Sequence, residues 1–174
     1  MLTPIGPEAM LANVYVEGNQ IKIKAWFLTP HTIGTCWAGS AEVSVADTSG
    51  LAAADAVVLA GAGPEGLHLV TTISSIAGQV VTLALPATTA VKWAVFGKLV
   101  DPSSVTFKVE EPDGDLVTKT DPDAAIAHPQ AGIFVLTYDP PVSGDGTYGY
   151  RVEGTGTAKG AAEDTFRVAS SRIV

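Results

Sequence analysis

The stretch IKIKAWF, residues 21–27, decides the class of fold that this sequence encodes. Its odd-numbered positions are apolar, and two of its three even-numbered positions are lysines. Successive side chains of a β-strand point to opposite faces, so this alternation is typical of a strand with one buried face. The predicted buried face holds Ile21, Ile23, Ala25 and Phe27.

Similar alternation, or short β-branched runs, recurs along the chain at short intervals. Further strands are predicted at 42–46, 56–60, 67–76, 79–85, 92–96, 105–109, 133–138, 147–152 and 165–168. Turn-forming pairs of Asp, Pro and Gly separate many of them. Only residues 4–13 and 51–58 have the composition for a short helical segment. The sequence therefore predicts a mainly β fold, built as an antiparallel sandwich or barrel.

The middle of the chain differs from its ends in composition. Residues 34 to about 97 are rich in Ala, Gly, Thr and Val and almost free of charge, whereas the flanks carry most charged residues. We interpret this shift as a small β-domain, residues 33–96, inserted after the first strand of another domain. That other domain comprises residues 14–32 plus 97–174, and residues 1–13 form an N-terminal arm.

Composition excludes several classes of partner. The 174 residues include 10 basic and 18 acidic ones, giving a net charge of −8. The basic residues are scattered, so we expect no direct contact with nucleic acid, which needs a basic patch. Cys36 is the single cysteine, and this excludes an intrachain disulfide. We expect neither a signal peptide nor a membrane span, and predict a soluble protein made in a cytosol-like compartment.

The stretch VVLAGAGPEG, residues 57–66, has the glycine spacing of a dinucleotide-binding loop, Gly61-x-Gly63-x-x-Gly66. That function needs a helix directly after the glycines and an acidic residue about 20 positions further on. Here a β-branched, alternating run follows, and the next acid after Glu65 is Asp101. We therefore predict a hairpin loop and no cofactor.

The acidic run at residues 110–123 leaves two interpretations open. Its carboxylates are the ligands that Ca²⁺ prefers, but their spacing is not that of an EF-hand. A cation site of another kind remains one alternative. The other is that Asp113-Gly114 forms the tight turn of a hairpin, with the remaining acids solvated.

No catalytic or metal constellation is found among the nucleophiles and histidines. His31, His68 and His128 lack a second ligand at metal-binding spacing. Cys36 has no basic neighbour in the sequence, so we expect a buried, unreactive thiol. We predict no catalytic residue, no metal and no enzymatic activity.

Six residues are the candidates for contact with a partner. Tryptophan is enriched at interface hot spots. Trp26 falls on the polar face of its strand, and Trp37 and Trp93 lie at the entry and exit of the inserted segment. Gly63, Pro64 and Glu65 form the predicted loop tip. Of these, Trp26 is the residue we most expect at an interface or at the junction of the two domains.

The joined flanks resemble small immunoglobulin-like β-sandwich proteins encoded among the virion structural genes of tailed bacteriophages. The resemblance covers roughly 90 residues and rests on the order of several short motifs. These are Asp101-Pro102 before Val105–Val109, Pro112-Asp113-Gly114, Gly132-x-Phe134, Gly146-Thr147-Tyr148-x-Tyr150-Arg151, Glu153-Gly154-Thr155-Gly156 and Glu163-x-x-Phe166-x-Val168. It implies an immunoglobulin-like sandwich, interrupted here by the middle segment.

The middle segment, residues 43–91, resembles a compact β-module of tail-associated and other virion proteins. The shared pattern is a Val-x-Val-x-Asp strand, a Gly-rich loop and a hairpin of the form Thr-x-Ile…Gly-x-x-Val-Thr-Leu. Ala54-Asp55 stands where that pattern has Gly-Asp, which is a mild departure.

These resemblances imply a structural protein of the virion, synthesised in the host bacterial cytoplasm. We expect it to dock by surface complementarity onto the capsid, as a decoration protein, or onto the head–tail neck. Its partners would be capsid, portal, neck or tail subunits, and it would be a homo-oligomer or present in many copies. The alternative is a tail-associated or particle-displayed adhesion or carbohydrate-binding module. That alternative requires Trp26, Trp93, Tyr148 and Tyr150 to form one exposed aromatic patch.

Overall fold

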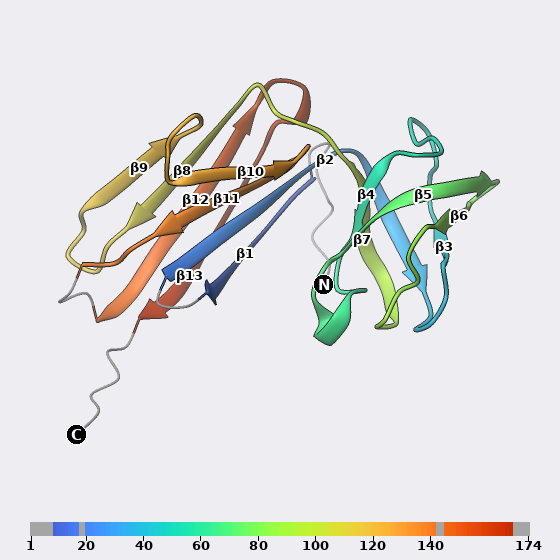
Figure 1. Cartoon of the computed structure of the whole chain (residues 1–174), viewed down its shortest axis with the longest axis horizontal. Coiled ribbons are helices and arrows are strands. Elements are labelled where there is room, and N and C mark those ends of the chain that lie inside the picture. Colours follow the sequence, from blue (N-terminus) through green and yellow to red (C-terminus); the bar gives the residue numbers. More distant parts are fainter. Residues whose placement is uncertain (1–8, 18–19, 142–144, 169–174) are drawn as a thin grey trace. The chain divides into compact units, whose positions relative to one another are not determined.

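The computed structural model describes residues 9–17, 20–141 and 145–168. Over these residues the chain forms thirteen β-strands and two three-residue 3₁₀ helices (Figure 1). The predicted mainly β fold is confirmed. The pairings among strands β2 to β13 are all antiparallel.

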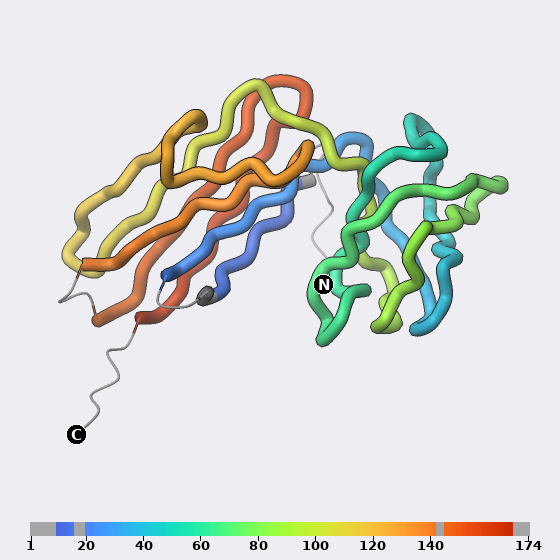
Figure 2. Tube along the Cα trace, in the orientation of Figure 1, coloured from blue at the N-terminus to red at the C-terminus, as the bar shows by residue number. Residues whose placement is uncertain are grey.

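The chain divides into two compact units, which we call the barrel unit and the sandwich unit. In the described part, the barrel unit holds residues 28–99 and is also assigned Ala9, and the described residues of 10–27 and 100–168 make the sandwich unit. Figure 2 shows the chain entering the barrel unit through one strand and leaving through another. The boundaries at 28 and 99 lie outside the expected 33 and 96, because β2 and β7 pair as far as Leu28 and Leu99.

The barrel unit is a closed ring of six strands. Strand β2 (Gln20–Cys36) contributes its second half, and the others are β3 (Glu42–Val45), β4 (Ala56–Leu59), β5 (Leu69–Ala77), β6 (Val80–Leu83) and β7 (Val91–Leu99). Their order is β2-β3-β6-β5-β4-β7, and β7 pairs back with β2. Closure leaves no unpaired sheet edge. The interior holds Val43, Val57, Leu59, Ile73, Val81 and Phe96, among others.

The sandwich unit contains two sheets around its own core. The first has the order β10-β11-β2 with β1 on the outside, where β1 is Ala9–Glu17, β10 is Ile126–Gln130 and β11 is Ile133–Tyr138. The second has the order β13-β12-β8-β9, which are Gly160–Val168, Gly146–Thr155, Ser104–Glu110 and Leu116–Thr120. The predicted inner face of residues 21–27 is confirmed, since Ile23, Ala25 and Phe27 lie in this core.

The N-terminal segment differs from its prediction. Residues 4–8 lie outside the described residues, but residues 9–13 belong to strand β1, so a helix there is wrong. Met10, Ala12 and Val14 pack against the sandwich core, which is the period-2 pattern of a strand. Pairing with β2 gives the backbone of this segment its hydrogen-bond partners, whereas a helix this short is only marginally stable by itself. The barrel unit therefore follows the second strand of the sandwich and not the first.

Candidate docking surfaces

Three loops meet at one end of the barrel unit. The N–H of Gly39 donates to the carbonyl of Ala87 at 2.7 Å, and the Ala87 N–H donates to the Ser40 carbonyl at 2.8 Å. The Thr88 N–H donates to the carbonyl of Ala62 at 2.9 Å. These bonds hold the segments 37–40, 84–90 and 61–68 together. The loops are thus positioned by backbone contacts that do not depend on the side chains they display.

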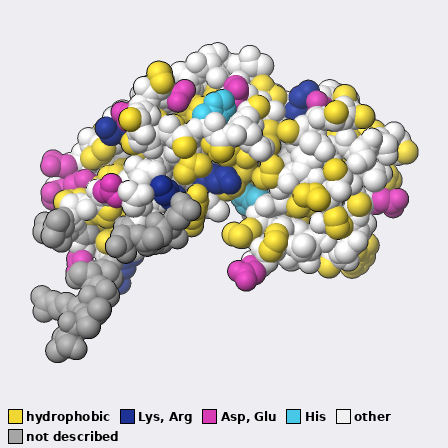
Figure 3. All heavy atoms as spheres, viewed as in Figure 1, with side chains coloured by type: hydrophobic (Ala, Val, Ile, Leu, Met, Phe, Trp, Pro, Cys, Tyr) yellow, Lys and Arg dark blue, Asp and Glu magenta, His cyan; other side chains and the backbone are white. Residues whose placement is uncertain are grey.

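Four large apolar side chains are exposed at this end. Trp37 is 77% exposed, Leu67 56%, Leu85 53% and Trp93 55%. We call these four residues the barrel tip. In the view of Figure 3, apolar side chains gather over the lower part of the barrel unit. Four such side chains together expose on the order of 500 Å² of apolar surface, which is near the largest patch of an ordinary monomer and is often functional.

Trp93 has an unusual backbone conformation. It lies in a bulge where Lys92 and Trp93 together oppose Thr35, between the pairs Gly34–Ala94 and Cys36–Val91. Its φ is +58°, in the left-handed region that costs an L-residue about 1–2 kcal/mol. Its N–H donates to Thr35 Oγ1 at 3.3 Å. Strain of this kind at an exposed aromatic is typical of functional positions.

The loop of residues 60–68 is the connection of the β4–β5 hairpin, as predicted. A Cβ on Gly63 would lie 2.9 Å from the Leu67 carbonyl oxygen, so the tight loop needs a glycine there. Pro64 begins a 3₁₀ helix, Pro64–Gly66, and Glu65 is exposed with φ +56°. The N–H of Gly61 is 3.3 Å from His68 Nδ1 across the loop. These three candidate residues therefore lie beside Leu67 at the barrel tip.

Trp26 is not at the surface. Its side chain is 3% exposed, and so is that of its register partner Ile133 on β11. The Lys24 ammonium lies 5.0 Å above the Trp26 ring, and burial lowers the pKa of Lys24. Lysine stems cover apolar surface while their ammonium groups remain polar, so alternating lysines did not mark a solvated face. Of the three candidate tryptophans, the structure exposes Trp37 and Trp93 only.

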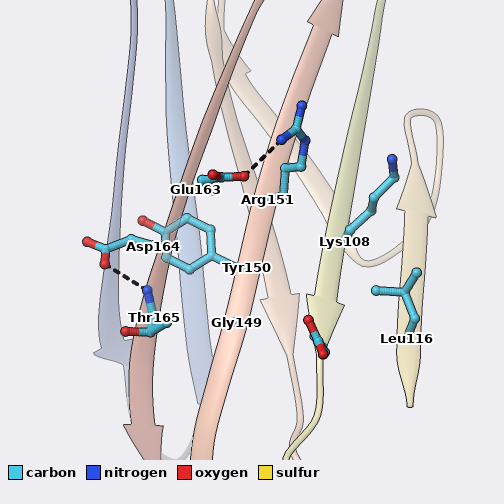
Figure 4. A pocket seen from close by; sticks show the side chains of 9 residues that line it. Lys108, Leu116, Gly149, Tyr150, Arg151, Glu163, Asp164 and Thr165 are labelled. Carbon is cyan, nitrogen blue, oxygen red and sulfur yellow. Dashed lines mark hydrogen bonds and ion pairs between the residues drawn. The ribbon is translucent and has the colours of Figure 1, made fainter. Parts of the chain in front are cut away.

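A second feature is a hollow of about 400 Å³ on the outer face of the four-stranded sheet. Figure 4 shows its centre at Gly149 on β12, with side chains from β8, β9, β12 and β13 around it. Its lining is Lys108, Glu110, Leu116, Gly149, Tyr150, Arg151, Glu163, Asp164 and Thr165. Leu116 is 61% exposed, so the hollow has an apolar wall.

Ion pairs fix the cationic side of this hollow. Arg151 Nε lies 2.7 Å from Glu153 Oε1, and Arg151 Nη1 lies 2.8 Å from Glu163 Oε2. Lys108 Nζ lies 2.8 Å from Glu153 Oε2. The hydrogen bonds and charges of Lys108 and Arg151 lower the pKa of Glu153. Among the described residues, Glu110 has no cation within ion-pair distance, and the Asp164 carboxylate accepts only from the Thr165 N–H at 2.8 Å.

The other candidate groups do not assemble into a site. Asp113-Gly114 is the turn of the β8–β9 hairpin, with Gly114 at φ +93°, as predicted. Across the described ranges, no group of three His, Cys, Asp or Glu side chains could hold a metal ion. His128 pairs with Asp101 at 2.9 Å. Cys36 is buried in the barrel core, and burial raises the pKa of its thiol.

The aromatic patch expected for a carbohydrate-binding module is not formed. Tyr148 is fully buried, and Tyr150 and Trp26 are nearly so. Tyr148 stacks on Phe166, with ring centroids 5.2 Å apart. The tyrosines of β12 therefore belong to the sandwich core.

Sequence reasoning missed Leu67, Leu85 and the Gly149 hollow. The two leucines were read as parts of strands, whereas both lie just beyond a strand end. Of these features, only the hollow had a signal in the sequence: Gly149 lies inside an alternating strand, and a glycine there often marks a close approach. In the described residues no helix has the length and apolarity to cross a membrane.

The chain was compared with protein families, curated proteins and solved structures. No protein-family model matches the chain, and no curated protein matches its sequence. Among solved structures, the phage phi92 endosialidase is similar over 95% of this chain and 30% of its own, with 16% identity and a TM-score of 0.29. The chain thus spans less than a third of that protein. At this level of likeness, no activity is transferred from it.

Proposed function

We propose that this chain is a non-enzymatic structural protein of a tailed-bacteriophage particle, and that it docks through the barrel tip. We propose the capsid surface or the head–tail neck as its position in the particle. The observation that carries the docking role is the barrel tip itself, where two tryptophans and two leucines stand exposed on hydrogen-bonded loops. The phage context rests on the resemblance of both parts of the sequence to virion proteins.

The energetics of the barrel tip fit a protein partner. Standard interfaces bury about 800 Å² on each side, with an apolar centre and a polar rim. The roughly 500 Å² of apolar tip surface would form such a centre. Glu65 and Lys92 flank it as charged rim residues. Tryptophan is enriched among interface hot spots, whose truncation costs about 2 kcal/mol or more.

The experiment is reconstitution onto purified particles that lack this chain. Wild-type protein is expected to bind in many copies, counted by quantitative mass spectrometry, and Trp37→Ser is expected to lose most of the binding. Tyr15→Ser is the matched control, because Tyr15 is an exposed aromatic that belongs to the sandwich unit and not to the tip loops. Absence of the chain from wild-type virions would overturn the proposal.

A carbohydrate-binding role on a tail or particle surface rests on Trp37 and Trp93 alone, since the tyrosine patch is buried. Aromatic faces do bind sugar rings. Quenching of the tip tryptophan fluorescence by soluble host-surface glycans, lost in Trp37→Ser, would favour this second function over docking.

A further inference from the structure

Gly149 occupies a position that the fold does not require to be glycine. It lies inside β12, paired in register with Glu110 on β8 and Thr165 on β13. A Cβ built there would lie 3.7 Å from the nearest atoms, which belong to Glu110 and make an ordinary van der Waals contact. Glycine weakens a strand interior. Because Gly149 has no side chain, its backbone forms the floor of the 400 Å³ hollow.

The same strand shows how an aromatic ring covers a glycine. At Gly154, the ring of Phe27 takes the space of the missing side chain, and a Cβ would lie 2.2 Å from Phe27 Cε1. Gly154 faces the core and Gly149 faces outward, because they are five residues apart on one strand. Among the described residues other than its two chain neighbours, no aromatic atom lies within 4 Å of a Cβ built at Gly149. Its neighbour Tyr150 is one of the residues that line the hollow. The hollow is therefore open to a ring from outside.

The walls of the hollow suit an indole with a neighbouring cation. Leu116 supplies apolar contact, and the Arg151 guanidinium is held by two carboxylates and can lie against an aromatic face. Glu110 and Asp164 add two carboxylates without a cationic partner among the described side chains. A volume of about 400 Å³ is within the range of ligand pockets, roughly 300–1,000 Å³.

This chain itself carries the matching group. Trp37 is the most exposed large hydrophobic residue of the described chain. At the same barrel tip, Lys92 Nζ lies 5.9 Å from the Trp93 ring centroid and forms no ion pair with a described residue. The barrel tip thus offers the exposed Trp37 indole and, next to Trp93, a Lys92 ammonium without an ion pair among the described residues. The hollow offers an open glycine floor with the carboxylates of Glu110 and Asp164 among its walls.

We infer that the chain associates head to tail with a second copy: Trp37 of one copy lies over Gly149 of the next, and Lys92 pairs with Glu110 and Asp164. This inference rests on the proposed docking role of the barrel tip and adds a second copy of the chain as a partner of that tip beside the particle. The two contacting surfaces differ, so the interface is heterologous, and an open assembly keeps one free tip at one end and one free hollow at the other. Such contacts build rings if the rotation closes and filaments if it does not.

The test uses two variants of the full chain, each defective in one surface. Trp37→Ser removes the ring, and Gly149→Val fills the hollow with a side chain that strands favour. By sedimentation velocity at roughly 100 μM, where contacts with a Kd near 10 μM are mostly formed, wild type is expected to be larger than a monomer. Each variant alone is expected to be monomeric. An equimolar mixture of the two is expected to form dimers and nothing larger, because one intact tip meets one intact hollow.

Leu116→Ser is a second hollow variant that leaves the strand backbone unchanged. Tyr15→Ser removes an exposed aromatic that is neither a tip residue nor a lining residue of the Gly149 hollow. It is the matched control and is expected to associate like wild type. A monomeric wild type overturns the inference, as does a mixture that stays monomeric or a single variant that still associates. Loss of Gly149→Val from particles with a monomeric wild type would assign the hollow to another protein. The proposed function fails separately, by absence of the chain from virions.

Discussion

The ring of Phe27 lies where the side chain of Gly154 would be. A Cβ on Gly154 would be 2.2 Å from Phe27 Cε1 and 2.7 Å from Cδ1. Phe27 comes from β2 in one sheet of the sandwich and Gly154 from β12 in the other. The two sheets therefore pack around one aromatic side chain, and the pair sets their separation at this point.

This contact predicts opposite effects for two glycines of β12. Gly154→Ala is expected to lower the free energy of unfolding by about 1–3 kcal/mol, because Phe27 must move in a close-packed core. Gly149→Ala is expected to raise it by about 0.5–1 kcal/mol, since the new Cβ has room and alanine is less flexible. Urea denaturation of both variants measures the difference. Equal destabilisation at the two positions would contradict the packing described.

The left-handed conformation of Trp93 predicts that glycine at this position gives a more stable protein than alanine does. Trp93→Gly and Trp93→Ala both remove the ring, but only alanine keeps the steric cost of φ +58°. We expect the glycine variant to be more stable than the alanine variant by about 1 kcal/mol. Thermal unfolding of the pair isolates this backbone term from the loss of the indole. If alanine is as stable as glycine, the backbone at Trp93 is not strained.

Alkaline pH is expected to destabilise the sandwich unit through its tyrosines. Tyr138 donates to Glu111 Oε1 at 2.5 Å, and burial, together with this carboxylate, raises the pKa of Tyr138 far above its usual value. Burial also raises the pKa of Tyr148 and Tyr150. The folded chain then holds phenolic protons that the unfolded chain releases near pH 10, so stability is intact below about pH 10 and falls as the pH rises further.

The variant Tyr138→Phe tests whether Tyr138 causes this loss of stability at alkaline pH. It is expected to make the decline of unfolding free energy above about pH 10 shallower, because one of the linked protons is gone. At pH 7 it is expected to cost about 1 kcal/mol for the lost hydrogen bond. Denaturation series between neutral and alkaline pH give both values. An unchanged alkaline slope would place the linkage at Tyr148 and Tyr150 alone.

The two cores are separate sets of side chains, which predicts local effects of cavity mutations. Phe96 lies in the barrel core and Phe107 in the sandwich core. Each Phe→Ala change is expected to cost about 3–5 kcal/mol within its own unit. Hydrogen exchange is expected to speed up at β4 and β7 for Phe96→Ala, and at β8 and β12 for Phe107→Ala. Uniform acceleration across both units would show that they unfold as one.

Ten of the thirteen strands follow from local sequence, and the three that do not have a common reason. Residues 105–109 and 133–138 were predicted almost to the residue, because the first alternates fully, the second is a β-branched and aromatic run, and each ends at a turn signal. The weaker segments 9–17, 116–120 and 126–130 lie at sheet edges and depend on pairing with a neighbour. An edge strand has one hydrogen-bonded neighbour and a partly solvated face, so its local pattern is less regular.

The candidate site shows the same difference between what local sequence predicts and what distant strand pairing decides. Trp37, Trp93 and the loop Gly63-Pro64-Glu65 were chosen from residue type and turn chemistry, and the structure places all of them at one end of the barrel unit. Trp26 was chosen by the same reasoning and is buried. One strand's alternation says which residues share a face, but not whether another layer covers that face.

By itself, the sequence determined the mainly β class, the hairpin turns and the strand that follows the Gly61–Gly66 loop, since period-2 patterning and positive-φ turn residues act over a few residues. Only the tertiary structure decided that the barrel closes on itself, that Trp26 is covered, and that Gly149 forms the floor of a hollow. Those properties depend on which distant strands pair, as β7 pairs with β2 and β8 with β12. Pairing between strands far apart in sequence is fixed by the burial of the whole chain, and no local pattern encodes it.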